Sequence, residues 1–271
     1  MKKSLVRIAS MLWPNGVTSF AYYQLTNPQV RKLRENELST LNTADQSILK
    51  FKGFDIQLYI WIGGAKSILL IHGWEGQAGN FSDLIKVLIE RDYTVYAFDG
   101  PSHGFSSKGK TSLFEFTELV GLLIKKYKVK NLVSHSFGGV ATTYALYQNP
   151  EIAIDKYVLL TTPDKFIERI DDVCHMVGIN DNIKKRLVER LENETGLSVL
   201  NLNVSDFVKS IHVNQALIIH DKDDKVIPIQ RSRNVHKNWS ASMFMQIDGT
   251  GHFRILRTPS VINDTIQFLK N

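Results

Sequence analysis

Several protein classes are excluded by what this 271-residue sequence lacks. Its single cysteine, Cys174, excludes an intramolecular disulfide framework and favours a reducing compartment. No apolar run approaches the roughly 18 residues that a transmembrane helix needs. The first residues resemble a signal peptide, but Arg7 interrupts the apolar stretch and Pro14 ends it before a secretory core forms. We therefore expect a cytoplasmic protein.

Signatures of cofactor and nucleic-acid binding are also missing. Neither G-x-G-x-x-G nor G-x-x-x-x-G-K-S/T occurs, which disfavours nucleotide binding. His72 and His103 have no partners at the spacing of metal ligands. No basic stripe with interleaved aromatic residues is present, which disfavours binding to nucleic acid. We expect no metal, no organic cofactor and no nucleic-acid partner.

The formal net charge of +6 is partly concentrated near the N-terminus. The basic residues in that segment are Lys2, Lys3, Arg7, Arg31, Lys32 and Arg34. They indicate either a solvated basic surface or a weak contact with an anionic membrane surface. The aromatic residues that favour the second interpretation are Trp13, Phe20, Tyr22 and Tyr23. Both interpretations stay open on the sequence alone.

Residues 46–271 show the alternation of strand and helix patterns that is typical of βαβ units. Short β-branched or apolar runs predict strands at 47–52, 54–62, 67–72, 94–99, 131–135, 156–161, 216–221 and 242–248. Helical spacing follows Asn80, a candidate N-cap, and covers residues 113–127 and the stretch after Ser136. The pattern predicts one α/β domain with a mainly parallel, eight-stranded sheet flanked by helices.

Two segments depart from this alternation. Residues 163–210 separate two predicted strands and have helical periodicity, so we expect them to form a small helical cap. Residues 1–45 lack the βαβ pattern and predict an N-terminal helical segment, packed on the core or loosely tethered to it.

The stretch SHSFGG, at residues 134–139, joins a predicted strand to a predicted helix. A serine nucleophile needs a general base, an orienting carboxylate and donors for the developing oxyanion. A sharp turn that exposes the serine also requires small residues two positions before and after it. Ser136 has Ser134 and Gly138 at these positions, whereas Ser134 has Leu132 two positions before it. The spacing favours Ser136, and close packing of small residues at a turn is the alternative.

Candidate partners for Ser136 follow it along the chain. Asp221, Asp223 and Asp224 come at the end of a predicted strand, and His252 lies in a later glycine-flanked loop. The order of serine, aspartate and histidine is that of the α/β-hydrolase triad.

Five stretches carry a resemblance to a known family from about Phe54 to the C-terminus. They are LLIHGWEG, FDGPSHGFS, HSFGG, HDKDDKVIP and GTGHF. In this order they resemble the oxyanion turn, the D-x-P-G-H-G-x-S loop, the nucleophile elbow, the acid loop and the histidine loop of the α/β-hydrolase fold superfamily, in its serine esterase and lipase-like branch. HGWEG is also like a set of bacterial hydrolases. The chain departs at Ser134, where the elbow usually has glycine, and at Asp221, where the acid loop has glycine.

The resemblance implies a catalytic role for each matching triad residue. Ser136 is the nucleophile, His252 is the general base and then the acid, and Asp224 is the orienting carboxylate. Asp223 is the close rival as the acid, and Asp221 is third.

The resemblance also implies an oxyanion hole and a pocket. The backbone N–H groups of Trp74 and Phe137 would form the oxyanion hole. Glu75 would line the pocket or be a solvated loop residue. His135 is expected to point to the opposite face of its strand if the alternation of side chains persists.

The function implied is hydrolysis of a carboxylic ester or thioester of a small molecule through an acyl-serine intermediate. Hydrolysis of an amide or a carbon–carbon bond by the same triad is the alternative reaction, because the fold alone does not fix the chemistry. A catalytically silent member that binds a small ligand under the cap is the alternative from another class.

Overall fold

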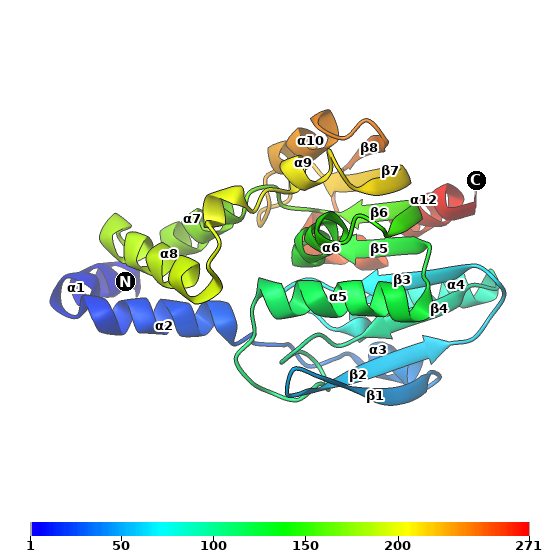
Figure 1. Cartoon of the computed structure of the whole chain (residues 1–271), viewed down its shortest axis with the longest axis horizontal. Coiled ribbons are helices and arrows are strands. Elements are labelled where there is room, and N and C mark those ends of the chain that lie inside the picture. The colour runs from blue at the N-terminus through cyan, green and yellow to red at the C-terminus, as the bar shows by residue number, and fades with distance from the viewer. Residues whose placement is uncertain (1, 271) are drawn as a thin grey trace.

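Eight strands form one sheet, in the order β1-β2-β4-β3-β5-β6-β7-β8, in the computed structural model, which describes residues 2–270 (Figure 1). The strands are β1 (Asp45–Phe51), β2 (Phe54–Trp61), β3 (Ser67–Ile71), β4 (Thr94–Phe98), β5 (Asn131–His135), β6 (Ala153–Leu160), β7 (His212–Asp221) and β8 (Ser242–Ile247). β2 pairs antiparallel with β1 and β4, and the other neighbours are parallel. Each predicted strand overlaps an observed one, so the predicted fold class is confirmed.

Helices cover both faces of the sheet. One face carries α5 (Leu113–Tyr127), α6 (Phe137–Gln148), α9 (Val204–Phe207) and α10 (Ile229–Lys237), and the other carries α3 (Glu35–Leu41), α4 (Ser82–Glu90) and α12 (Pro259–Lys270). In β3, Leu69 and Ile71 belong to the first core, and Ile68 and Leu70 to the second. Burial on both faces explains why the central strands are continuous apolar runs.

Short helical turns follow two of the strands. η1 (Ala78–Phe81) comes after β3, and α11 (Gly251–Arg254) and η3 (Ile255–Arg257) come after β8. The prediction of Asn80 as an N-cap was wrong, because Asn80 lies inside η1 and α4 begins at Ser82. Its side chain instead accepts a hydrogen bond of 3.0 Å from the backbone N–H of Gln77.

A group of helices stands apart from the sheet at one end of the molecule (Figure 1). We call it the cap lobe, and it contains α1 (Lys2–Leu12), α2 (Pro14–Thr26), α7 (Phe166–Val177), α8 (Asp181–Thr195) and η2 (Val199–Asn201). Its apolar core combines two distant parts of the chain, with the buried residues Ala21, Tyr22, Ile170, Cys174, Leu187 and Val199. The first two helices of the chain therefore pack with the insertion, whereas α3 packs beside α4.

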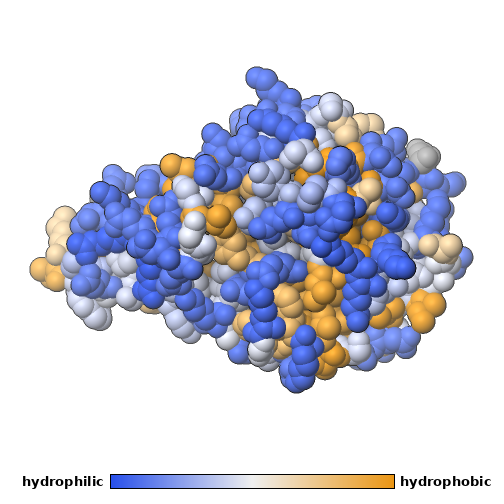
Figure 2. Space-filling view, in the orientation of Figure 1, coloured by the Kyte–Doolittle hydropathy of each residue, from blue (hydrophilic) through white to orange (hydrophobic). Residues whose placement is uncertain are grey.

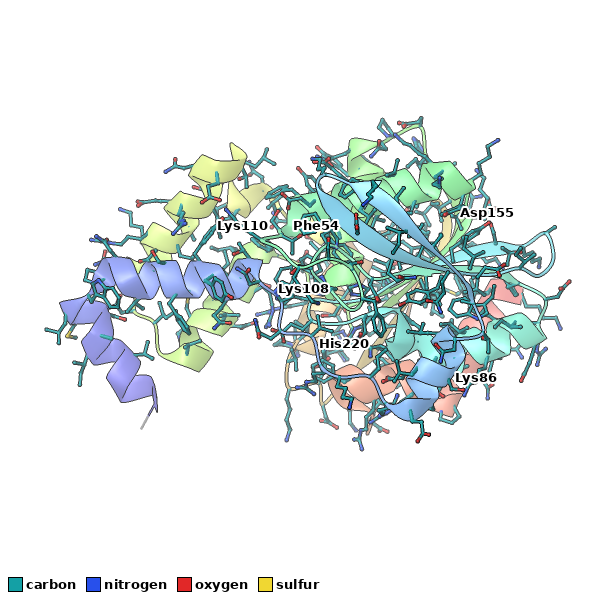
Figure 3. All side chains as sticks on the ribbon, turned by 90° about the horizontal axis from the view of Figure 1, so that it is seen from below. Phe54, Lys86, Lys108, Lys110, Asp155 and His220 are labelled. Atoms are coloured by element: carbon teal, nitrogen blue, oxygen red, sulfur yellow. The ribbon has the colours of Figure 1, made fainter. Side chains whose placement is uncertain are left out.

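A polar cluster joins the cap lobe to the rest of the molecule. Lys110, in the loop before α5, lies at this junction (Figure 3). Its Nζ is 2.7 Å from Oε2 of Glu194 on α8, and the hydroxyl of Tyr22 donates to the same carboxylate. The guanidinium of Arg190 lies 3.8 Å from the centre of the Tyr22 ring. The cluster thus links α2, α8 and the loop before α5.

Candidate active site

Ser136 occupies the sharp turn between β5 and α6. Its φ of 52° and ψ of −121° lie outside the regions that serine ordinarily adopts. A Cβ at Gly138 would lie 2.6 Å from two backbone carbonyl oxygens at the end of β3, so the turn requires glycine there. Ser134 is buried, and its hydroxyl is 2.8 Å from that of Tyr157. Of the two serines, only Ser136 lines the cavity described below.

The three side chains predicted as a triad lie within hydrogen-bonding distance of one another. Nε2 of His252 is 3.0 Å from Oγ of Ser136, and Nδ1 of His252 is 2.8 Å from Oδ2 of Asp224. They come from the loops after β5, β7 and β8, which end at the same edge of the sheet. The arrangement can pass a proton from the serine to the histidine while the carboxylate orients the ring.

Asp224 is held as a carboxylate at this edge. Its other oxygen, Oδ1, accepts backbone N–H groups from Val226 (2.7 Å) and Ile227 (2.9 Å). Burial raises the pKa of Asp224, but the hydrogen bond from His252, its charge and the two backbone donors outweigh burial and lower the pKa below its ordinary value. The carboxyl is therefore ionised and can stabilise a protonated imidazole.

The rival aspartates occupy different positions. Asp221 accepts hydrogen bonds from the hydroxyl of Thr250 (2.8 Å) and the N–H of Gly251 (2.7 Å), so it holds the loop that carries His252. Asp223 is exposed, and its backbone N–H donates to Asp221. Of the three, Asp224 is the one whose carboxylate contacts His252.

His135 is the last residue of β5, and its side chain lies beside His252 at the cavity. Its Nε2 donates a hydrogen bond of 2.8 Å to the backbone carbonyl of His252, and the two ring centres are 4.9 Å apart. Burial lowers the pKa of His135 to about 3, so the ring is neutral.

The predicted oxyanion donors lie next to each other. Phe137 is the first residue of α6, where the N–H has no acceptor within its own helix. Trp74 follows β3, and its ring centre is 5.2 Å from that of Phe137. No backbone hydrogen bond donated by either residue is found among residues 2–270. Both N–H groups are therefore free to bind an oxyanion.

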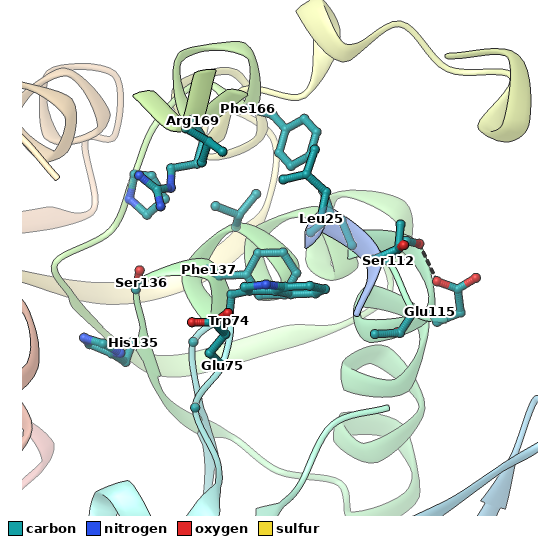
Figure 4. Close-up of a pocket in the computed structure, with 18 of the residues that line it drawn as sticks. Leu25, Trp74, Glu75, Ser112, Glu115, His135, Ser136, Phe137, Phe166 and Arg169 are labelled. Atoms are coloured by element: carbon teal, nitrogen blue, oxygen red, sulfur yellow. Dashed lines mark hydrogen bonds between the residues drawn. The ribbon is translucent and has the colours of Figure 1, made fainter. Parts of the chain in front are cut away.

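A cavity of about 1080 Å³ separates Ser136 from the cap lobe (Figure 4). Its apolar wall includes Leu25, Phe114, Phe137, Val140, Phe166, Ile170, Val173 and Leu191. Glu75 is exposed at the cavity edge, and its carboxylate accepts a 3.3 Å hydrogen bond from the N–H of Gln29. Within residues 2–270, no group of three His, Cys, Asp or Glu side chains is placed to hold a metal ion.

Two contributions to this cavity were not singled out in the sequence, although residues 163–210, which include α7, were expected to form the cap. α2 supplies Tyr22, Leu25 and Thr26, and α7 supplies Arg169. Neither segment carries a motif that marks it as part of a cavity wall. Its place in the wall depends on how the cap lobe packs over the sheet.

Comparisons with known proteins agree with this architecture. A family model described as alpha/beta hydrolase fold matches residues 66–196. The uncharacterized hydrolase YugF of Bacillus subtilis is 22% identical over 76% of this chain and 91% of its own length. A serine hydrolase-like protein of Homo sapiens is 30% identical over 46% of this chain, and this match spans only 61% of the human protein. The solved structure of an enol-lactonase from Burkholderia xenovorans has a TM-score of 0.64 and 15% identity, and covers 83% of this chain and 100% of that one.

These similarities agree with two features of the structure, the order of the strands in the sheet and the strand-to-helix turn at Ser136. The chain has the α/β-hydrolase fold, and a family model of that fold matches residues 66–196.

Proposed function

We propose that this protein is a serine hydrolase that cleaves a carboxylic ester or thioester through an acyl-serine intermediate. The observation that carries the proposal is the continuous pair of contacts from Ser136 through His252 to Asp224, at 3.0 and 2.8 Å. Esters and thioesters come before amides because an alcohol or thiol leaves more readily than an amine.

The proposed reaction has two halves. Oγ of Ser136 attacks the carbonyl carbon while its proton passes to Nε2 of His252, and the N–H groups of Trp74 and Phe137 stabilise the oxyanion. His252 then returns the proton to the departing alcohol or thiol, which leaves an acyl-serine. Water, activated by the same imidazole, attacks this ester and releases the acid and free Ser136.

The apolar wall of the cavity supports an acyl chain as part of the substrate. Its residues come from α2, α5, α6, α7 and α8, so an acyl chain bound to Ser136 would be enclosed by both the helices on the sheet and the cap lobe.

The cytoplasmic location predicted from the single cysteine is part of the same proposal. Cys174 is a free, buried thiol.

Labelling with a fluorophosphonate probe tests the nucleophile. We expect one labelled site, Ser136, and no labelling in Ser136→Ala, whose kcat for p-nitrophenyl butanoate falls by about 10³- to 10⁶-fold. Ser134→Gly is the matched control and keeps both labelling and turnover. A probe found on Ser134, or wild-type turnover in Ser136→Ala, would exclude the mechanism and leave a ligand-binding role.

A weak contact with an anionic membrane surface is a second proposal, supported by the tip of the cap lobe. Ile8, Met11, Leu12 and Trp13 are 55–81% exposed at the corner between α1 and α2, and Figure 2 shows apolar side chains there. Tyr22, one of the aromatic residues that favoured this contact in the sequence, is buried and so does not contribute to the exposed tip. No helix within residues 2–270 is long and apolar enough to cross a membrane.

Co-sedimentation with phosphatidylglycerol vesicles tests this contact. We expect the double variant Leu12→Ser, Trp13→Ser to sediment less than the wild type. Phe105→Ser, which removes an exposed aromatic from the loop after β4, is the control and should sediment like the wild type. Equal sedimentation of all three proteins would exclude a contact through the lobe tip.

A further inference from the structure

Arg169 is a cation of the cap lobe that is placed to bind an anionic ligand in the cavity. It is in the first turn of α7 and lines the same cavity as Ser136 and His252. Figure 4 shows it extending from α7 toward the side of the cavity on which Ser136 and His135 lie. A guanidinium in this position can reach a substrate bound at the serine.

The donors of Arg169 are poorly used by the protein. Its Nη1 is buried and has no hydrogen-bond partner among residues 2–270. The carboxylate that pairs with it, Asp172, is 3.6 Å away and lies one turn along the same helix. A pair of this kind contributes little, because both residues share one helix and the distance exceeds that of a hydrogen bond.

A second arginine explains why Asp172 does not satisfy Arg169. Arg231 donates to both carboxylate oxygens of Asp172, at 2.5 and 3.0 Å, and its Nε is 3.0 Å from Glu168. Arg231 therefore pairs with both Asp172 and Glu168, and Nη1 of Arg169 is left without an acceptor among residues 2–270. Its side chain is 34% exposed.

Arg31, Lys32, Lys165 and Arg257 also line the cavity and form no ion pair within residues 2–270, but they are exposed, whereas Arg169 is partly buried. Two other cations of the lining are paired with acids. Lys110 lies 2.7 Å from Glu194, and Arg34 lies 2.8 Å from Glu37. Burial lowers the pKa of Arg169, and the charges of Asp172 and the triad residue Asp224 oppose this. A guanidinium nevertheless stays protonated in proteins, so Arg169 is a partly desolvated charge beside the triad.

We propose that Arg169 binds an anionic group, a carboxylate or a phosphate, that the ester substrate carries close to its scissile bond. This inference rests on the proposed hydrolase function and narrows its substrate class to amphiphilic anionic esters. Arg169 supplies the planar donors that match such anions. Phe166, Ile170 and Val173 on the same helix supply the apolar wall for the hydrocarbon part.

Matched esters with and without an anion test the proposal. On the acyl side, mono-p-nitrophenyl glutarate is compared with p-nitrophenyl pentanoate. On the alcohol side, 3-carboxyphenyl and 3-phosphonooxyphenyl butanoate are compared with phenyl butanoate, which separates carboxylate from phosphate. For each pair the measured quantity is the ratio of kcat/KM for the anionic ester to that for the neutral one.

We expect Arg169→Gln to lower this ratio by about 10- to 100-fold for at least one pair, because a hydrogen-bonded charge pair is lost. Arg169→Lys should retain part of it. Arg233→Gln, which removes an exposed arginine of α10 outside the cavity, is the matched control and keeps the wild-type ratio. A ratio that changes less than twofold for every pair would overturn the proposal, as would an equal loss for neutral and anionic esters.

A measurement on the wild-type protein covers the case in which Arg169→Gln does not fold. Pentanoate and pentyl phosphate are compared with pentanol as inhibitors of p-nitrophenyl butanoate turnover. At least one anion should inhibit competitively about tenfold more strongly than pentanol, and equal inhibition by all three would overturn the proposal. Loss of Ser136 labelling would refute the hydrolase function itself, whereas labelled, active enzyme without anion selectivity refutes only the role of Arg169.

Discussion

The imidazole of His135 donates a hydrogen bond of 2.8 Å to the backbone carbonyl of His252. The residue just before the proposed nucleophile therefore fixes the main chain of the proposed base. Because the two residues are 117 positions apart, the contact links the end of β5 directly to α11.

Removing this donor should disturb catalysis more than folding. His135→Phe keeps a ring but loses the N–H, and we expect kcat for p-nitrophenyl acetate to fall by about tenfold because supporting partners of catalytic groups typically contribute this much. His135→Gln can still donate and should recover part of the rate. Thermal unfolding is measured in parallel, and a lower Tm with unchanged kcat would mean that His135 only stabilises the fold.

Asp224→Asn should lower kcat by about 10⁴-fold, because the ring of His252 loses its orientation and its counter-charge. Asp223→Asn is the control, since that carboxylate is exposed and does not contact His252. Steady-state kinetics with one ester checks both variants. A larger effect at Asp223 would show that the acid has been assigned to the wrong residue.

Acid should destabilise the protein through its buried neutral histidines. Burial lowers the pKa of His72 to about 4, and its Nε2 accepts the N–H of Gly100, which requires an unprotonated nitrogen. The unfolded state, with a histidine pKa of about 6.5, binds more protons, so stability is full above that pH and falls as the pH drops toward 4. Each such histidine lowers the free energy of unfolding by about 1.4 kcal/mol for each pH unit that the pH falls within this window.

Urea unfolding between about pH 7 and pH 5 measures this slope. His72→Gln should have a shallower slope than the wild type, whereas His212→Gln, at an exposed position, should keep the wild-type slope. Equal slopes in all three proteins would exclude His72 as a source of acid sensitivity.

Gly138 should not tolerate a side chain. A Cβ would lie 2.6 Å from two carbonyl oxygens at the end of β3, so Gly138→Ala should destabilise the protein by at least about 2 kcal/mol. Gly121→Ala, inside α5 with its nearest neighbour at 3.4 Å, should be neutral or stabilising by up to about 1 kcal/mol. Equal unfolding free energies for the two variants would contradict the tight packing of the elbow against β3.

The cap lobe should control which acyl chains are accepted. Val173→Lys places a charge on the cavity side of α7, and we expect the ratio of kcat/KM for p-nitrophenyl octanoate to that for the acetate to fall by about tenfold or more. Leu200→Lys changes an exposed residue of η2 outside the cavity and serves as the control. An equal response of short and long esters would exclude the lobe as a specificity element.

Local sequence patterns predicted the parts of the molecule that depend on local physics. The strands of the parallel sheet are apolar runs because helices cover both faces, and the turn at Ser136 needs the small residues on either side of it. The proximity of Ser136 and His252 was inferred from a resemblance, since nothing local brings two loops together.

The errors and omissions concern contacts between distant segments or competition between neighbouring turns. Asn80 is a good capping residue, but its side chain accepts a hydrogen bond from the N–H of Gln77 within η1, before α4 begins. The cavity positions of Leu25 and Arg169 depend on how α2, α7 and α8 pack together, which no periodicity within a single helix records.

The link between Tyr22 and Glu194 spans 172 positions of the chain. During synthesis, α2 therefore leaves the ribosome long before α8 exists, and it has no partner for its buried face until most of the sheet has been made. Contacts at such separation form late, because the intervening loop must first be ordered. We expect the nascent chain to form the turn at Ser136 before α2 meets α8, and to complete the proposed triad last, because Asp224 and His252 follow α8 in the sequence.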